Sequence, residues 1–146
     1  MECDMEYIVS ACLVGVKCRY DGTDSLDYEV AQLVASGKAL PVCPEQLGGL
    51  STPRLPAEII DGDGRSVLKG EAKVLTKNGS DVTRAYIMGA REAFKLARLA
   101  GVNKAITKER SPSCGCMYIY RGNEVVPGKG VMVALLEKEG IEVTSV

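Results

Sequence analysis

The segment Lys108-Glu109-Arg110-Ser111-Pro112-Ser113-Cys114-Gly115-Cys116 combines charges, hydroxyls and two thiols, and it has no apolar periodicity. It directly follows Ala105-Ile106-Thr107, an apolar run that is typical of a buried strand. We therefore expect the polar segment at the carboxyl end of that strand, where open α/β sheets bind their ligands. Cysteine segments around Cys12 and Cys43 follow apolar runs in the same way. Because each of these three loops follows a predicted strand of the same sheet, we expect the loops to meet and form one site.

The length and charge of the chain limit the classes of protein it can belong to. Its 146 residues predict one domain, spanning residues 1–146, with a core large enough to fold without disulfides or metals. The net charge of −1 argues against bulk nucleic-acid binding. No apolar stretch approaches the roughly 20 residues of a membrane-spanning helix, and the acidic N-terminus lacks the basic region of a signal peptide. We expect a cytoplasmic protein whose thiols are reduced.

The sequence contains no histidine and six cysteines. The absence of histidine excludes Ser-His-Asp and Cys-His nucleophile systems, and zinc sites with imidazole ligands. Acid–base chemistry must therefore come from carboxylates, lysine, tyrosine, cysteine or hydroxyl groups. In a small cytoplasmic protein, several cysteines are more often metal-binding or catalytic than disulfide-bonded.

Apolar runs and helix-stop signals alternate along the chain. They predict strands over residues 7–11, 39–43, 102–107 and 141–144, and helices over residues 26–36, 82–99 and 130–138. This alternation is typical of a single-domain, doubly wound α/β fold with a mostly parallel sheet, Rossmann-like or flavodoxin-like. Ser25 is expected to cap the first helix, and Ser80 or Asp81 the second.

Three further segments do not fit the main alternation. Residues 44–56 are rich in proline and glycine and are expected to form a long functional or mobile loop. Residues 67–68 and 72–75, separated by a glycine step, predict a small hairpin insertion. Residues 117–120 predict a short extra strand. Pro41 is unusual for a central strand, which weakens the prediction over residues 39–43.

Three of the cysteines are placed to bind a metal centre. Cys12, Cys43 and Cys114 fall at or just after the carboxyl ends of predicted strands, and convergent thiolates without histidine suit a soft metal or an iron–sulfur cluster. Taken singly, each could equally be a small buried packing residue. Cys18 and Cys116 could supply a fourth ligand or be spare thiols, and Cys3 is expected to have no role.

Glu45 follows Cys43 by two residues, and Pro44 stiffens the link between them. A carboxylate beside a metal centre could serve as a general base. The alternative is a salt bridge from Glu45 to Arg54 or Arg110.

The polar segment of residues 108–116 contains further residues that could contact a substrate. Ser111 and Ser113 could hydrogen-bond a substrate, or they could cap loop backbone. Lys108, Glu109 and Arg110 lie between a strand and the thiols, so we expect them to form a wall of the site and to contact substrate.

Several common motifs are absent. A phosphate-binding Cys-x5-Arg loop would need arginine where Cys18 stands, and Arg19 comes one residue late. No Gly-x4-Gly-Lys-Ser/Thr or strand-linked Gly-x-Gly-x-x-Gly motif is present, so a nucleotide cofactor is not expected. The lack of Cys-x-x-Cys weakens a thiol-redox role.

The motifs together resemble the DUF523 family over nearly the whole chain. The matching segments are SACL (10–13), CRYDG (18–22), CPE (43–45), GGL (48–50), PR (53–54), PAEI (56–59), KERSPSCG (108–115) and VPG-x-GV (126–131). The family includes the thiouracil desulfurases. The resemblance implies a [4Fe-4S] cluster held by Cys12, Cys43 and Cys114 alone, which leaves one iron open.

The resemblance also implies an activity. The sulfur of a thiouracil-like substrate, a thiolated pyrimidine or related thioamide, would bind the open iron. Glu45 would activate water to attack the adjacent carbon, Ser111 would contact substrate or relay a proton, and sulfide would leave. The alternative is a non-catalytic protein that carries a cluster or senses redox state.

Overall fold

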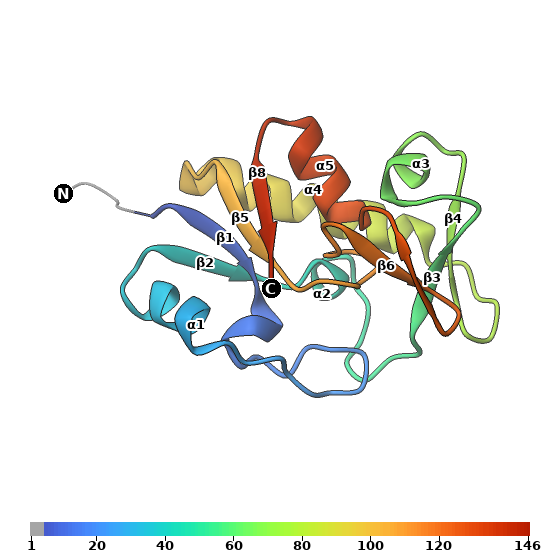
Figure 1. Cartoon of the computed structure of the whole chain (residues 1–146), viewed down its shortest axis with the longest axis horizontal. Helices are drawn as coiled ribbons and strands as arrows, with labels where there is room; N and C mark the ends of the chain where they lie inside the picture. The colour runs from blue at the N-terminus through green and yellow to red at the C-terminus, as the bar shows by residue number, and fades with distance from the viewer. Residues whose placement is uncertain (1–4) are drawn as a thin grey trace.

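The computed structural model describes residues 5–146, and its centre is a four-stranded parallel sheet (Figure 1). The order is β2-β1-β5-β8, with β1 at Tyr7–Ser10, β2 at Ala39–Val42, β5 at Lys104–Thr107 and β8 at Glu142–Ser145. The parallel α/β architecture predicted from the alternation of elements is confirmed. Cys3 lies outside the described residues.

Helices pack on both faces of the sheet (Figure 1). The long helix α4 (Thr83–Ala100) and α5 (Val131–Lys138) share the larger core with strand residues such as Ile8 and Ala105. Fully buried alanines at 90, 93 and 97 let α4 lie close to its neighbours. On the opposite face, α1 (Tyr28–Ala35) and the single turn η1 (Ala11–Val14) pack over β1 and β2. The fold is therefore doubly wound.

Pro41 is tolerated because β2 is an edge strand of the sheet. A proline lacks the backbone N–H that a central strand needs for its ladder, but an edge strand pairs on one side only. The strand predicted here is confirmed, and the proline marks its place in the sheet.

The helix starts differ from prediction by a few residues. Helix α1 is capped by Asp27, whose Oδ1 accepts from the backbone N–H groups of Glu29 and Val30, and the predicted cap at Ser25 is wrong. The side chain of Asp81 accepts from the N–H of Thr83 at the start of α4. Gly101 ends α4 in the left-handed region, at φ +72°.

The segment 44–76 departs most from the sequence prediction. Its expected loop begins with a short helix, α2 (Pro44–Leu47), before the irregular chain from 48 to 56. The predicted hairpin of 67–68 with 72–75 is wrong, because Gly64–Leu68 forms helix α3 and β4 (Lys73–Thr76) pairs with β3 (Ala57–Ile60). A capping box of Asp63 and Ser66 starts α3, whose apolar run is too short to distinguish helix from strand.

A hairpin lies beside the antiparallel pair of β3 and β4. The predicted strand near 117–120 is present as β6 (Tyr118–Arg121), and it pairs with the unpredicted β7 (Glu124–Pro127). The carboxylate of Glu58 on β3 accepts from the N–H of Gly122 in the β6–β7 turn, which joins the hairpin to the β3–β4 pair. Among the described residues, no helix is long and apolar enough to cross a bilayer.

Candidate functional site

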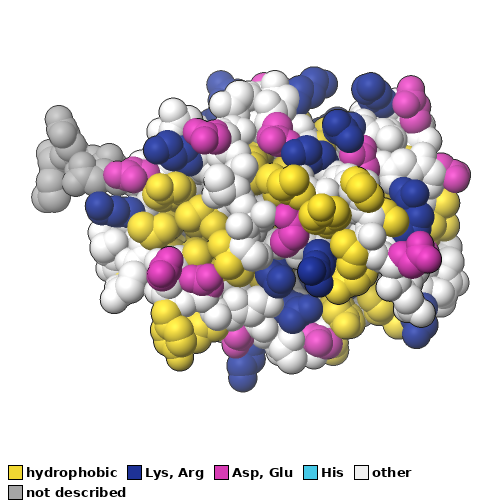
Figure 2. Space-filling view, in the orientation of Figure 1, with side chains coloured by type: hydrophobic (Ala, Val, Ile, Leu, Met, Phe, Trp, Pro, Cys, Tyr) yellow, Lys and Arg dark blue, Asp and Glu magenta, His cyan; other side chains and the backbone are white. Residues whose placement is uncertain are grey.

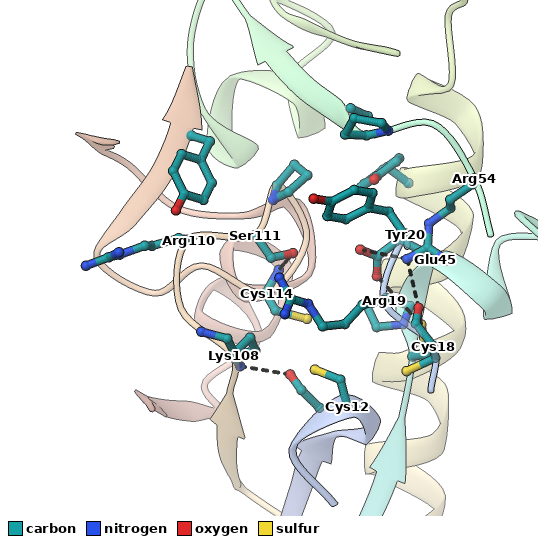
Figure 3. Close-up of a pocket in the computed structure, with 18 of the residues that line it drawn as sticks. Cys12, Cys18, Arg19, Tyr20, Glu45, Arg54, Lys108, Arg110, Ser111 and Cys114 are labelled. Carbon is teal, nitrogen blue, oxygen red and sulfur yellow. Dashed lines mark hydrogen bonds and ion pairs between the residues drawn. The ribbon is translucent and has the colours of Figure 1, made fainter. Parts of the chain in front are cut away.

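A pocket of about 620 Å³ opens at the carboxyl ends of β1, β2 and β5, and all three candidate ligand cysteines line it (Figure 3). Cys12 comes from η1, Cys43 follows β2 directly, and Cys114 comes from the loop after β5. The two small two-stranded sheets supply part of the opposite wall through β3 and β6 residues. The fold thus brings the three cysteine loops together at the edge where α/β sheets bind ligands.

Each cysteine is held by local backbone structure. Cys12 lies in the single 3₁₀ turn that follows β1, and Cys43 is the N-cap residue of α2. The backbone of Cys114 is fixed by Ser111, whose Oγ accepts from the N–H groups of Ser113 and Cys114 at 3.0 Å each. Rigid backbone at all three positions favours a preorganised site.

The pocket disfavours isolated thiolates at Cys12, Cys43 and Cys114. Burial and then the Glu45 carboxylate raise the pKa of Cys12 to about 11, and the same two causes raise the pKa of Cys114. A hydrogen bond with Cys18 and then burial raise the pKa of Cys43. Reactive or redox-exchanging cysteines need the opposite shift. These thiols would lose their protons to a bound metal centre, because its positive charge offsets both burial and mutual repulsion.

The donor set suits an iron–sulfur cluster better than a single ion. In the part of the chain that the structure describes, no three side chains of His, Cys, Asp or Glu converge closely enough to hold one metal ion. Three separate thiols nevertheless face one pocket with room between them. A cluster distributes its cysteine ligands over several iron atoms and so fits thiols that are spread around a cavity.

Glu45 lies in the pocket beside Cys43 and Arg54. Its Oε1 is 3.9 Å from Cys43 Sγ, and its Oε2 is 3.7 Å from Arg54 Nη2, with side chains only 12% and 11% exposed. Burial raises the pKa of Glu45, while Arg54 opposes that shift. Arg54 is itself fixed, since its Nη2 donates to the carbonyl of Cys18 at 3.0 Å. The salt bridge that the sequence left open is therefore formed with Arg54.

Some side chains of the polar segment 108–116 line the pocket, and others support the surrounding structure. Lys108, Ser111 and Arg110 line the pocket, although in Figure 3 the Arg110 side chain extends away from the cysteines. Ser113 is fully buried and does not line the pocket, so its position does not support the predicted substrate contact. Glu109 reaches the pocket wall, but its carboxylate is engaged by the protein itself.

The Glu109 carboxylate organises the chain after the cysteine loop. It accepts from the N–H groups of Cys116, Met117 and Tyr118, and from the Ser145 hydroxyl at 2.6 Å. Burial raises its pKa, but these hydrogen bonds outweigh burial and the net shift is downward. Such a carboxylate has little capacity left for substrate, so a structural task replaces the predicted contact.

Glu109→Gln is expected to lower stability most at neutral pH. Because the folded-state pKa lies below the unfolded value of about 4.3, the carboxylate stabilises the fold above that value. This contribution is lost as the pH falls through the folded pKa. Urea unfolding should show a loss of about 1–3 kcal/mol near neutrality that shrinks toward acid. A loss of equal size at all pH values would contradict this account.

The other two cysteines are placed differently from each other. Cys18 is buried, lines the pocket and lies within hydrogen-bonding reach of the Cys43 thiol. Cys116 does not line the pocket, and its Sγ lies 3.6 Å from the carbonyl oxygen of Val143 in β8. Of the two, Cys18 alone is near enough to the site to contribute a further thiol.

Sequence reasoning missed several pocket residues, and two of them, Arg19 and Tyr86, lie near the proposed ligands. Arg19 was considered only as an arginine out of register, yet Figure 3 shows its side chain crossing the pocket toward Cys114 and Ser111. It joins Lys77, Lys108 and Arg110 among the lining cations, and Figure 2 shows Lys and Arg side chains gathered near the middle of this face. Tyr86 also lines the pocket, but its sequence position in a long helix indicates only a residue of the apolar core.

Helix α2 reaches its place because two glycines allow close contact with α4. A Cβ on Gly89 of α4 would lie 1.8 Å from the carbonyl oxygen of Pro44, and one on Gly48 would lie 2.0 Å from that of Ala85. Only glycine fits such a crossing. The contact sets the depth of α2, and with it the positions of Cys43 and Glu45.

Gly89→Ala is therefore expected to destabilise the protein. Alanine favours a helix over glycine by about 1 kcal/mol, but overpacking costs about 1–3 kcal/mol or more. The clash is with backbone, which cannot rotate away, so the cost should exceed the gain. Thermal unfolding would measure this, with Arg91→Ala on the exposed side of α4 as the control. A Gly89→Ala protein as stable as wild type would show that α2 can shift freely.

Comparisons with known proteins agree with this geometry. Residues 7–146 match the model of the family described as 2-thiouracil desulfurase. A protein of Bacillus subtilis (strain 168), described as uncharacterized protein YbbK, is 45% identical over 141 residues, which cover 94% of this chain and 93% of that protein. The solved structure of the [4Fe-4S]-dependent thiouracil desulfidase TudS is similar with a TM-score of 0.85 and 41% identity, covering 97% of this chain and 90% of that one.

Proposed function

Because this chain belongs to the 2-thiouracil desulfurase family, we propose that it removes sulfur from a thiouracil-like thiocarbonyl substrate by hydrolysis, with the help of a [4Fe-4S] cluster. The observation that carries the proposal is the meeting of Cys12, Cys43 and Cys114 with Glu45 in one pocket. A thiolated pyrimidine or related thioamide is the substrate class. The similarity to TudS over nearly the whole chain supports both cluster and substrate.

Cys12, Cys43 and Cys114 would hold the cluster, since their thiols face the same cavity from three separate loops. With three protein ligands, the cluster would supply one open, Lewis-acidic iron able to take the sulfur of a thiocarbonyl. The raised pKa values of Cys12 and Cys114 argue against free nucleophilic thiolates, and a bound cluster would stabilise the thiolate form of both residues.

Glu45 is the general base of this proposal. Its carboxylate lies in the pocket at 3.9 Å from Cys43 Sγ, close to where substrate sulfur would be held. It would take a proton from the water that attacks the carbon bonded to sulfur. Burial raises the pKa of Glu45, which makes the carboxylate a stronger base, and the neighbouring Arg54 partly offsets that shift and favours the charged form.

Ser111 contributes a hydroxyl to the same wall. Its oxygen already accepts two backbone N–H groups, so its own proton remains free to be donated into the pocket. We assign it a hydrogen bond to substrate or a proton relay, and Lys108 and Arg110 the outer wall. In the overall reaction, thiocarbonyl and water give carbonyl and hydrogen sulfide, with no net change of oxidation state.

One observation favours a second function. Cys18 lies beside Cys43 and lines the pocket, so it could add a fourth thiolate and close the cluster. A closed cluster has no open iron and suits a carrier or redox sensor.

Anaerobic reconstitution with iron and sulfide, followed by incubation with 2-thiouracil, tests the proposal. We expect four irons per chain, release of one sulfide per uracil formed, and oxygen from labelled water in the product. A cluster that forms in the wild type but releases no sulfide would favour the carrier or sensor function. A protein that takes up no iron would exclude both.

A further inference from the structure

Tyr86 is a buried phenol at the pocket that the proposed mechanism does not use. It lies on α4, only 4% of its surface is exposed, and it lines the pocket together with Glu45 and Cys114. Its ring belongs to the main apolar core. A tyrosine with its ring in the core and its hydroxyl at a cavity is rigidly held and can make one directed polar contact.

The crossing of α2 and α4 places the hydroxyl in the catalytic part of the pocket. Gly89 meets Pro44 and Gly48 meets Ala85, so Tyr86 lies alongside the turn of α2 that carries Glu45. The charges that act on the phenol are those of Glu45, Arg54, Cys114 and Cys43. The hydroxyl therefore shares the pocket with the general base and with two proposed cluster ligands.

The side-chain hydrogen bonds of the described residues include none from Tyr86, and its hydroxyl is not one of the fully enclosed polar atoms without a partner. Because Tyr86 lines the pocket, its hydroxyl is free to bind a group that enters the pocket. Burial and then the Glu45 carboxylate raise the pKa of Tyr86 far above its usual range. The phenol therefore stays protonated and can offer a donor, but it cannot act as a base.

We propose that the Tyr86 hydroxyl donates a hydrogen bond to the oxygen that water adds to the reacting carbon, on which negative charge develops as it loses its protons and becomes the carbonyl oxygen of the product. This inference rests on the proposed function and adds a substrate-contacting residue to it. The proton stays on Tyr86 throughout, and no bond to it is made or broken. A fixed donor aimed at developing charge acts in the same way as an oxyanion-hole donor.

Tyr86→Phe removes the hydroxyl and keeps the ring in the core. We expect kcat/KM for 2-thiouracil to fall on the order of a hundred-fold. The dissociation constant of uracil, measured by calorimetry on the reconstituted protein without turnover, should rise about three- to ten-fold, the usual range for one hydrogen bond. Iron content and thermal stability should stay close to wild type. Tyr28→Phe, which removes a hydroxyl that is exposed and far from the pocket, is the matched control.

Unchanged kcat/KM and uracil affinity in a fully loaded Tyr86→Phe protein would overturn the inference. Loss of the cluster in Tyr86→Phe but not in Tyr28→Phe would also overturn the inference, because Tyr86 would then have a purely structural role. Failure of the wild-type protein to release sulfide would instead contradict the proposed function. The two failures are therefore distinguished by the wild-type reaction.

Discussion

Alanine at Cys12, Cys43 or Cys114 is expected to abolish both cluster loading and sulfide release from 2-thiouracil. Each thiol lines the same pocket from a different loop, so no other member of the set can replace it. Losing one of three protein ligands would leave two irons without a cysteine, and such a cluster is readily lost. Iron and sulfide content after anaerobic reconstitution, and the visible absorbance of the cluster, would measure the loss.

Cys116→Ala is the matched control for these variants. Cys116 lies in the same loop as Cys114, but its thiol faces the Val143 carbonyl and does not line the pocket. We expect it to keep wild-type iron content and turnover. If Cys116→Ala lost the cluster while Cys114→Ala kept it, the assignment of ligands would be wrong. Circular dichroism of each variant would confirm that the fold survives.

The central fold could be predicted because its signals are local. Apolar runs such as 7–11 and 102–107 end at loops rich in glycine or cysteine, and alternation with helices implies a parallel sheet. The prediction for residues 57–76 was wrong because the helix and strands there are only four or five residues long. At that length a run of apolar residues does not distinguish a strand from a helical turn. Pairing of β3 with β4 depends on contacts across the intervening helix.

The candidate site could be predicted where its residues lie in loops that follow the carboxyl ends of strands. The proposed ligand cysteines and Glu45 lie within a few residues of such ends. Ser113 and Glu109 lie in the same polar segment, but Ser113 is buried against the scaffold and the Glu109 carboxylate accepts from four backbone N–H groups. Spacing along the chain cannot distinguish a side chain that faces the cavity from one that organises the loop behind it.

Tyr86 had no signal in the sequence at all. It occupies a helical position flanked by apolar residues, which is typical of core packing, and its ring does pack in the core. Its place in the pocket follows from the close crossing of α2 and α4, which depends on Gly48 and Gly89. Arg19 was visible but misjudged, because it was tested only against a motif that the chain does not contain.

Glu45→Gln is expected to lower turnover by about 10²–10⁴-fold while the cluster still loads. Glutamine has nearly the same shape, and its carbonyl oxygen can still face Arg54, which lies 3.7 Å from the carboxylate in the native protein. The amide cannot take a proton from water at physiological pH. The loss should therefore fall on kcat, with iron content unchanged. Glu71→Gln, at an exposed position outside the pocket, is the control for the charge change.

Two results would decide what Glu45 does. If Glu45→Gln lost its cluster, the carboxylate would be needed to hold the metal centre, and its proximity to Cys43 at 3.9 Å would be the reason. If the variant kept both cluster and full turnover, water would have to be activated by another group. The buried Tyr86 stays protonated and the Ser111 oxygen is already occupied, so neither could easily take over as base. Glu45 is therefore the carboxylate to which we assign proton removal in this pocket.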